Sequence, residues 1–212
     1  MFGTHDLWLF VLSGLLLNIT PGPDTLYIIG RSTTQGRRAG AVAALGIGAG
    51  VLVHVCAAAL GLSALLAASA NAFTAVKIIG AAYLVYVGIG LLHSAGSIRS
   101  SAIAAEMRAA SMRSIFFQGF LTNVLNPKVA LFFIAFLPQF VGNEAPSKPL
   151  AFVFLGAIFD INGTLWNLLV AQITTRVSRG LAPGNALRRW FNRCVGAVFI
   201  AVGVRLALAH DR

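Results

Sequence analysis

The stretch Asn18-Ile19-Thr20-Pro21-Gly22-Pro23-Asp24 interrupts the first apolar segment of the chain, residues 7–30. Its two prolines have no backbone N–H, so the carbonyls of Leu17 and Ile19 lose the donors that a continuous helix would supply. The glycine between them allows a turn that a residue with a Cβ would resist. Within a membrane, freed carbonyls and a carboxylate such as that of Asp24 are tolerated only where they line a cavity or meet protein partners. This stretch is therefore the first candidate site.

The composition is that of an integral membrane protein. Of the 212 residues, 58% are hydrophobic and only 10% are charged, and the mean hydropathy is +0.82. Soluble domains carry about 25% charged residues, so this chain would lack a water-facing surface and requires a lipid bilayer. The net charge of +10 does not point to nucleic acid, because the positive residues lie between apolar segments and not on one face or tail.

Six apolar segments have the length of about 20 residues that a membrane span needs. We therefore expect an all-α integral membrane protein with six transmembrane helices, of which helices one and four are broken at proline motifs. The first segment has no positively charged stretch before it, so it is interpreted as a retained span and not as a signal peptide. The six segments are residues 7–30, 39–70, 73–93, 115–141, 150–175 and 190–209.

The chain divides into two similar halves at a polar linker. Asn18-Ile19-Thr20-Pro21 in the first half corresponds to Asn123-Val124-Leu125-Asn126-Pro127 in the second. A second match, in the same order, joins residues 77–81 to residues 193–197. Three spans per half is an odd number, so the second half must be inverted, as in many secondary transporters. The predicted single transporter domain, 1–212, comprises repeat one (about 1–95), a cytoplasmic linker (about 96–113) and repeat two (about 114–212).

Arginines mark the predicted membrane topology. They concentrate in the connections between spans one and two, three and four, and five and six, and such positive connections stay cytoplasmic. Both termini are therefore predicted to be periplasmic. The arginines are Arg31, Arg37, Arg38, Arg99, Arg108, Arg113, Arg176, Arg179, Arg188 and Arg189.

Lys128 and Asp160 are expected near the middles of spans four and five, where an unpaired charge costs several kcal/mol. Lys128 follows Asn126 and Pro127, and this proline frees the carbonyl of Asn123. One interpretation is a structural Lys128–Asp160 ion pair. The other is a polar cavity in which these groups bind a substrate or exchange a proton.

The spacing argues against contact between Asp24 and Lys128. Asp24 follows Asn18 by six residues, and Lys128 follows Asn123 by five. If both asparagines lie near the midplane of inverted halves, Asp24 and Lys128 point to opposite membrane faces, roughly 15 Å apart. We therefore expect Lys128 to pair with Asp160, and Asp24 to lie at the cytoplasmic mouth.

Span two holds one ionisable residue and a run of small ones. His54 is a possible proton relay, although a lone histidine in a span more often hydrogen-bonds across helices. The small residues, which include Gly46 and Gly50, allow close helix approach, either inside the protein or at a homodimer interface.

The sequence contains none of the enzyme motifs HExxH, GxSxG or a phosphate loop. We expect no enzymatic activity, no cofactor and no metal site. One alternative is a membrane thiol–disulfide electron carrier using Cys56 and Cys194. Carriers of related architecture are expected to place cysteines beside the prolines, where this chain has Thr20 and Leu125. A passive channel is a further alternative, but it would have little need for buried opposite charges.

Four motifs resemble those of the LysE/RhtB family of bacterial amino-acid exporters. They are the Asn18–Asp24 stretch, Gly36-Arg37-Arg38-Ala39-Gly40, Leu125-Asn126-Pro127-Lys128 and Phe136-Leu137-Pro138-Gln139-Phe140. The resemblance implies a six-span protein of the bacterial inner membrane that exports small amino acids or their derivatives, driven by an ion gradient.

A small amino-acid substrate needs a partner for each of its two charges. Lys128 and the N-termini of half-helices suit its carboxylate, whereas Asp24, Asp160 and freed carbonyls suit its ammonium. Asp160 or Asp24 is also the candidate to bind a proton in exchange for substrate. The sequence therefore predicts a proton-coupled antiporter.

Overall fold

The computed structural model describes residues 2–62, 109–142 and 144–177, together with single positions between 78 and 204. This part of the chain is helical and contains no β-strand beyond one isolated bridge between Thr4 and Val141. Its elements are α1 (Leu7–Ile19), α2 (Pro23–Ala57), the π-helical turn η1 (Ala58–Leu62), α6 (Met112–Val124), α7 (Pro127–Ala135), the 3-10 turn η2 (Leu137–Phe140) and α8 (Lys148–Val177).

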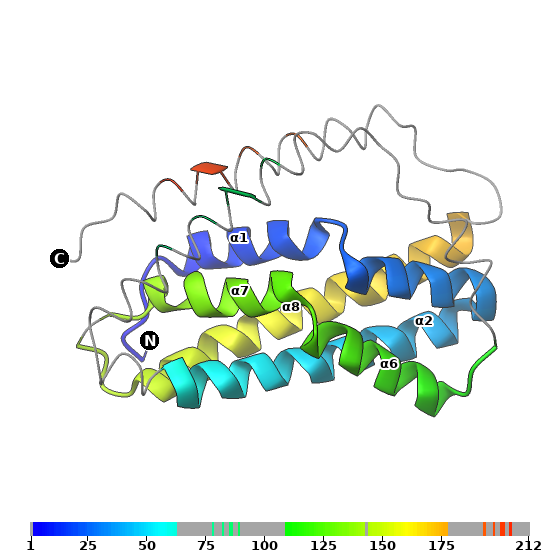
Figure 1. The fold of residues 1–212 in the computed structure, drawn as a ribbon, viewed down its shortest axis with the longest axis horizontal. Helices are drawn as coiled ribbons and strands as arrows, with labels where there is room; N and C mark the ends of the chain where they lie inside the picture. The colour runs from blue at the N-terminus through cyan, green and yellow to red at the C-terminus, as the bar shows by residue number, and fades with distance from the viewer. Residues whose placement is uncertain are drawn as a thin grey trace.

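Helix α2 is a hairpin of two helices. Its backbone leaves the helical conformation at Gly36, with φ 82° and ψ −178°, a region that is essentially restricted to glycine. A Cβ on Gly40 would collide with the Oγ of Ser32, although eight residues of straight helix would separate them by about 12 Å. The chain therefore reverses at Gly36, and Figure 1 shows one half of α2 continuing past α1 and the other returning.

Both proline motifs interrupt helices, as the sequence predicts. The backbone is extended at Thr20 and at Gly22, between α1 and α2. The second break separates α6 from α7 and bends this helix pair by 48°. Figure 1 shows the two broken helices running in opposite directions, with their breaks at about the same level along the long axis.

The structure does not use the backbone freedom predicted for Gly22. Its φ of −153° and ψ of −172° are extended values that any residue can adopt, so backbone freedom is not the reason for a glycine here. A Cβ at this position would lie 3.5 Å from Lys128 Nζ and 3.7 Å from its Cδ. These are ordinary van der Waals distances, so no clash with the lysine requires a glycine here either.

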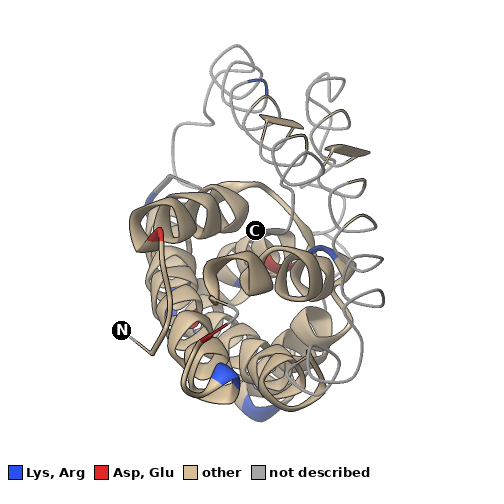
Figure 2. Cartoon of the chain, turned by 90° about the vertical axis from the view of Figure 1, so that its left-hand side faces the viewer, with Lys and Arg blue, Asp and Glu red and all other residues tan. Residues whose placement is uncertain are grey.

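Two described segments are long and apolar enough to cross a membrane, Pro23–Leu62 and Lys148–Arg176. The bent pair Met112–Val124 and Pro127–Phe140 makes a third if it counts as one span. The 40 residues of the first segment correspond to about 60 Å of helix, twice a hydrocarbon core of about 30 Å, which suits a segment that reverses. Charged positions are sparse along these helices (Figure 2). The predicted spans 73–93 and 190–209, and most of the linker 96–113, lie outside the described residues.

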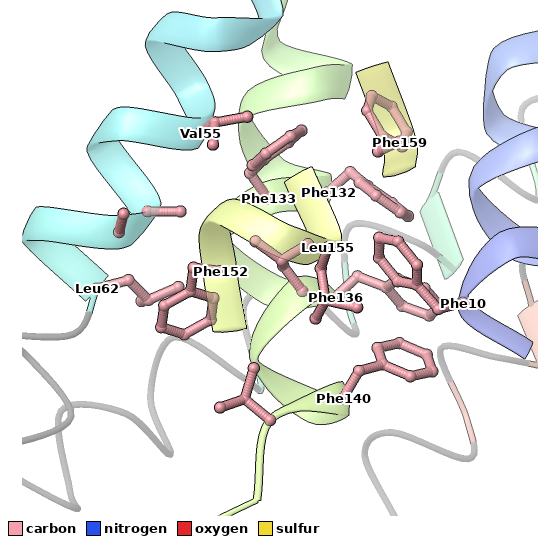
Figure 3. Close-up of a cluster of buried hydrophobic side chains, with 14 of the residues drawn as sticks. Phe10, Val55, Leu62, Phe132, Phe133, Phe136, Phe140, Phe152, Leu155 and Phe159 are labelled. Atoms are coloured by element: carbon pink, nitrogen blue, oxygen red, sulfur yellow. The ribbon is translucent and has the colours of Figure 1, made fainter. Parts of the chain in front are cut away.

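Two separate apolar cores hold these helices together. The aromatic core joins α1, α7, η2 and α8 to η1 and the end of α2 that precedes it. The Phe132 ring stacks on Phe136 at 4.8 Å and on Phe159 at 4.9 Å between centroids. Figure 3 shows these rings grouped with that of Phe10. The small-residue core lies elsewhere and comprises Ile28, Ala39, Ala43, Ala44, Ile47, Ile115 and Ala171.

Glycines allow α2 and α6 to pack backbone against backbone. A Cβ on Gly46 would collide with the carbonyl oxygen of Phe116. One on Gly119 would lie 2.7 Å from the carbonyl oxygen of Ala43. The small residues of the second span therefore serve internal packing, one of the two roles that the sequence allows. The homodimer stays a prediction.

Candidate functional site

A polar layer lies between the two cores. Each described segment that passes from the aromatic core to the small-residue core has polar or glycine residues between the two. The flanking pairs are Leu17 and Ile28, Val51 and Ile47, Val129 and Ile115, and Phe159 and Ala171. The residues between them include both proline motifs, Gly48, Gly50, Asp160 and Thr164.

Lys128 supplies the donors that the first break lacks. Its Nζ donates to the carbonyl oxygens of Leu17 at 2.7 Å and Thr20 at 2.8 Å. The Leu17 carbonyl is one that Pro21 is predicted to free, so that prediction is confirmed. A side chain of the second motif thus completes the hydrogen bonds of the first.

Asp24 makes the reciprocal contact, from the first motif to the second. Its Oδ2 accepts from Asn123 Nδ2 at 2.8 Å and from Asn126 Nδ2 at 3.0 Å. The Oδ1 of Asn126 accepts from the backbone N–H of Lys128 at 3.0 Å, so this residue also caps α7. The charges of Asp24 and Lys128 interact with each other. The two breaks are therefore interlocked by a carboxylate and an ammonium.

The predicted separation of Asp24 and Lys128, and the predicted Lys128–Asp160 pair, are wrong. Both rested on an unbroken helical rise through the motifs, whereas the backbone is extended at Thr20 and Gly22. Asp24 and Lys128 each take the second position of the helix that starts after its break. Both therefore lie at the level of the breaks. No ion pair joins Lys128 to Asp160 in the parts of the chain described.

His54 hydrogen-bonds across helices, as the sequence predicts for a lone histidine. Its Nε2 lies 3.1 Å from the carbonyl oxygen of Asn123. Since a carbonyl only accepts, Nε2 carries the proton. Pro127 removes the i+4 donor of this carbonyl, which also accepts from the backbone N–H of Asn126 at 2.9 Å. At each break, a basic side chain therefore binds a carbonyl that has lost its helical i+4 donor. Asn123 links His54, through its backbone, to Asp24, through its side chain. A proton relay through His54 stays a prediction.

Asp160 and Asn18 lie in the same polar layer, but they have no described hydrogen bond to Asp24, Lys128 or the two asparagines. Asp160 Oδ1 accepts from Thr164 Oγ1 at 3.3 Å. A Cβ on Gly48 would lie 3.2 Å from that carboxylate oxygen, so the glycine admits Asp160 against α2. Asn18 lies against Gly163 of α8, and its buried Nδ2 has no hydrogen-bond partner among the described residues.

A polar network around Arg31 was not predicted. This arginine is buried, and it donates to Gln35 Oε1 and Gln118 Oε1, both at 2.7 Å. Its Nε also donates to Tyr27 Oη at 3.3 Å, and that hydroxyl donates to the Ile115 carbonyl at 3.0 Å. The signal in the sequence is the spacing of Tyr27, Arg31 and Gln35, which places them on one helical face.

Opposite charges at the interlocked breaks of two apolar helices are typical of secondary transporters, whose sites lie at discontinuous helices. The chain belongs to the LysE type translocator family, whose sequence profile matches residues 15–210. It is therefore a membrane transport protein and not an enzyme, and the predicted family is confirmed. The thiol of Cys56 is free and exposed.

Several relatives match almost the whole chain. The membrane protein PA4757 of Pseudomonas aeruginosa is 32% identical, covering 98% of this chain and 97% of the relative. The membrane protein YrhP of Bacillus subtilis is 28% identical, over 97% of this chain and 100% of its own. The leucine efflux protein of Salmonella typhimurium is 25% identical, over 97% and 96%. No solved structure matches the chain significantly.

Proposed function

We propose that this protein exports amino acids across the bacterial inner membrane in exchange for protons. One observation carries the proposal: Lys128 and Asp24 meet at the interlocked breaks, so an ammonium and a carboxylate are held in one polar layer. An amino acid has the same two charges and can be matched at both. The relatives named leucine efflux proteins make leucine the first substrate to test.

The groups around the breaks suit the two ends of an amino acid. Asp24 Oδ1 is buried and has no partner among the described residues, so it is an open acceptor for an ammonium. The carbonyls of Leu17 and Thr20 offer further acceptors, and Lys128 offers its charge to a carboxylate. The N-termini of α2 and α7 begin at the breaks, and their partial positive charge favours an anion.

We assign proton exchange to Asp160. Asp24 has its charge balanced by Lys128, whereas the described partner of Asp160 is the hydroxyl of Thr164. A carboxylate in the polar layer without a described cation is suited to alternate between charged and neutral forms. The charge of the layer would then change with each proton bound, which couples the layer to the proton gradient.

The proposed architecture is six spans in two inverted repeats, about 1–95 and 114–212, joined by a cytoplasmic linker and with both termini periplasmic. The antiparallel course of the two broken helices, each restarting at a proline, supports the inversion (Figure 1). Reporter fusions at the C-terminus and within residues 94–114 are expected to give opposite locations. The same location from both would refute this topology.

The function is tested by leucine efflux from loaded membrane vesicles with an imposed pH gradient. Wild-type protein is expected to move leucine against its gradient when protons flow the opposite way. Asp160→Asn is expected to lose this uphill efflux yet retain exchange of internal for external leucine, because the substrate groups remain. Uphill efflux by Asp160→Asn would refute the proton assignment. No efflux of any amino acid by the wild type would refute the function.

A further inference from the structure

The ammonium group of Lys128 occupies a site that has the chemistry of an ammonium receptor. It donates to the carbonyl oxygens of Leu17 and Thr20 at 2.7 and 2.8 Å, in the field of Asp24. A primary ammonium has three donors and no acceptor, which is equally true of the α-ammonium of an amino acid. The buried Oδ1 of Asp24, unpartnered among the described residues, is a further acceptor in this layer.

We propose that Lys128 is a tethered occupant of the substrate's ammonium site. The α-ammonium of the substrate displaces Nζ from the Leu17 and Thr20 carbonyls, and the released lysine then binds the α-carboxylate. This inference rests on the proposed export of amino acids and adds to it a mechanism of selection. Lys128 is thus a competitor of the substrate in the empty site and a ligand in the loaded one.

The contacts of Lys128 allow its side chain to leave without moving α7. The backbone N–H is held separately, by the cap from Asn126 Oδ1 at 3.0 Å. Nζ is hydrogen-bonded to carbonyl oxygens and not to a carboxylate in the described structure. Gly22 has no side chain beside Nζ, and even a Cβ there would lie 3.5 Å from it, an ordinary van der Waals distance. A flexible four-carbon stem can therefore change position.

The charge balance of the site decides which molecules enter. With Asp160 in its proton-bound, neutral form, the empty site holds one positive and one negative charge, from Lys128 and Asp24. A zwitterion adds none, so the loaded site stays balanced. An amine adds an uncompensated positive charge, and a carboxylate an uncompensated negative one, and burying an unpaired charge is costly. The site therefore selects molecules that carry both groups.

Single substitutions should change this selection in opposite directions. In Lys128→Met, Asp24 is left without its cation, and an amine restores the balance where a zwitterion does not. In Asp24→Asn, Lys128 is left without its anion, and a carboxylate restores the balance. The ligands to compare are leucine, 3-methylbutylamine and 4-methylpentanoate, which share one branched side chain and differ only in their charged groups.

The experiment measures the ligand concentration that gives half of the maximal thermal stabilisation of the full-length protein in detergent. For Lys128→Met, the leucine value should rise on the order of 100-fold, as expected when one charge of a buried pair is removed. The value for 3-methylbutylamine should fall below that for leucine. The control is Lys148→Met, the same substitution at the first residue of α8 and outside the polar layer; it should match wild type for all three ligands.

The outcomes separate this inference from the proposed function. Unchanged preference in Lys128→Met would overturn the inference even if the wild type exports leucine. If Lys128→Met does not fold, Asp24→Asn decides: a gain of 4-methylpentanoate over leucine supports the inference, and no gain overturns it. A third outcome is that the wild type binds no amino acid while Lys128→Met binds the amine. This outcome would refute amino-acid export and support the ammonium site.

Discussion

Substitution of Gly46 by alanine tests the packing that positions the site. A Cβ at this position would collide with the carbonyl oxygen of Phe116 and lie 3.0 Å from its carbonyl carbon. These are backbone atoms of α6, so no side-chain rotation relieves the contact. The two helices must therefore move apart. Because Asn123 of the polar layer belongs to α6, this movement also displaces a residue of the site.

The magnitude follows from the kind of neighbour. Overpacking a close-packed site costs about 1–3 kcal/mol of folding free energy. Because the neighbour of Gly46 is backbone, which cannot rotate away, the expected cost of Gly46→Ala is about 2–3 kcal/mol, in the upper part of that range. A chain of about 200 residues loses roughly 2–4 °C of melting temperature per kcal/mol, so a decrease of about 5–10 °C is expected. Separation of α2 from α6 should also lower amino-acid efflux per folded molecule.

The assay is thermal melting of the purified protein in detergent, with Gly61→Ala as the matched control. Gly61 belongs to η1, and a Cβ there would meet no atom of the described residues within 4 Å. The control should melt within about 2 °C of wild type, since open surface substitutions usually change stability by less than about 0.5 kcal/mol. Equal melting of the two variants would refute the close backbone contact.

Three further predictions concern the breaks, the hairpin and the histidine. Pro21→Ala and Pro127→Ala restore backbone donors that compete for the freed carbonyls, so both variants should reach the membrane normally and export poorly; wild-type efflux at equal surface level would contradict this. Gly36→Ala forces an alanine into a backbone conformation that costs about 1–3 kcal/mol, so it should lower the melting temperature. An unchanged melting temperature would mean that the chain reversal at this position does not need a glycine. His54→Phe removes one hydrogen bond, worth about 1 kcal/mol, and should lower the melting temperature by a few degrees without abolishing the proposed proton-driven efflux. Loss of that efflux at normal folding would support a proton relay.

Local chemistry made much of the site predictable. Proline removes a donor wherever it stands, so the interruptions at Pro21 and Pro127 and the freed carbonyl of Leu17 follow from the residues alone. The crossing hydrogen bond of His54 follows from the same reasoning, since a lone polar side chain in an apolar span seeks a partner on another helix. The sequence also sufficed for the family, because its motifs span both halves.

The partner of each charge was not predictable in this way. Asp24, Lys128 and Asp160 are all partly buried and could be paired in more than one way. A helical rise of about 1.5 Å per residue gave the wrong pair, because the rise does not continue through the extended backbone at Thr20 and Gly22. The Arg31 network was not predicted because an arginine at the end of a span is also what the positive-inside rule expects of a cytoplasmic connection.

The sequence by itself determined that this is a membrane protein of the LysE type translocator family with two broken helices. Hydrophobicity, the missing N–H of proline and motif identity belong to single residues and short stretches, so they do not depend on how the chain folds. Only the tertiary structure decided that Lys128 completes the first break and that Asp24 binds the asparagines of the second. The reason is physical: which charges meet depends on the direction in which the backbone leaves each break, and that direction is set by packing between helices far apart in the chain.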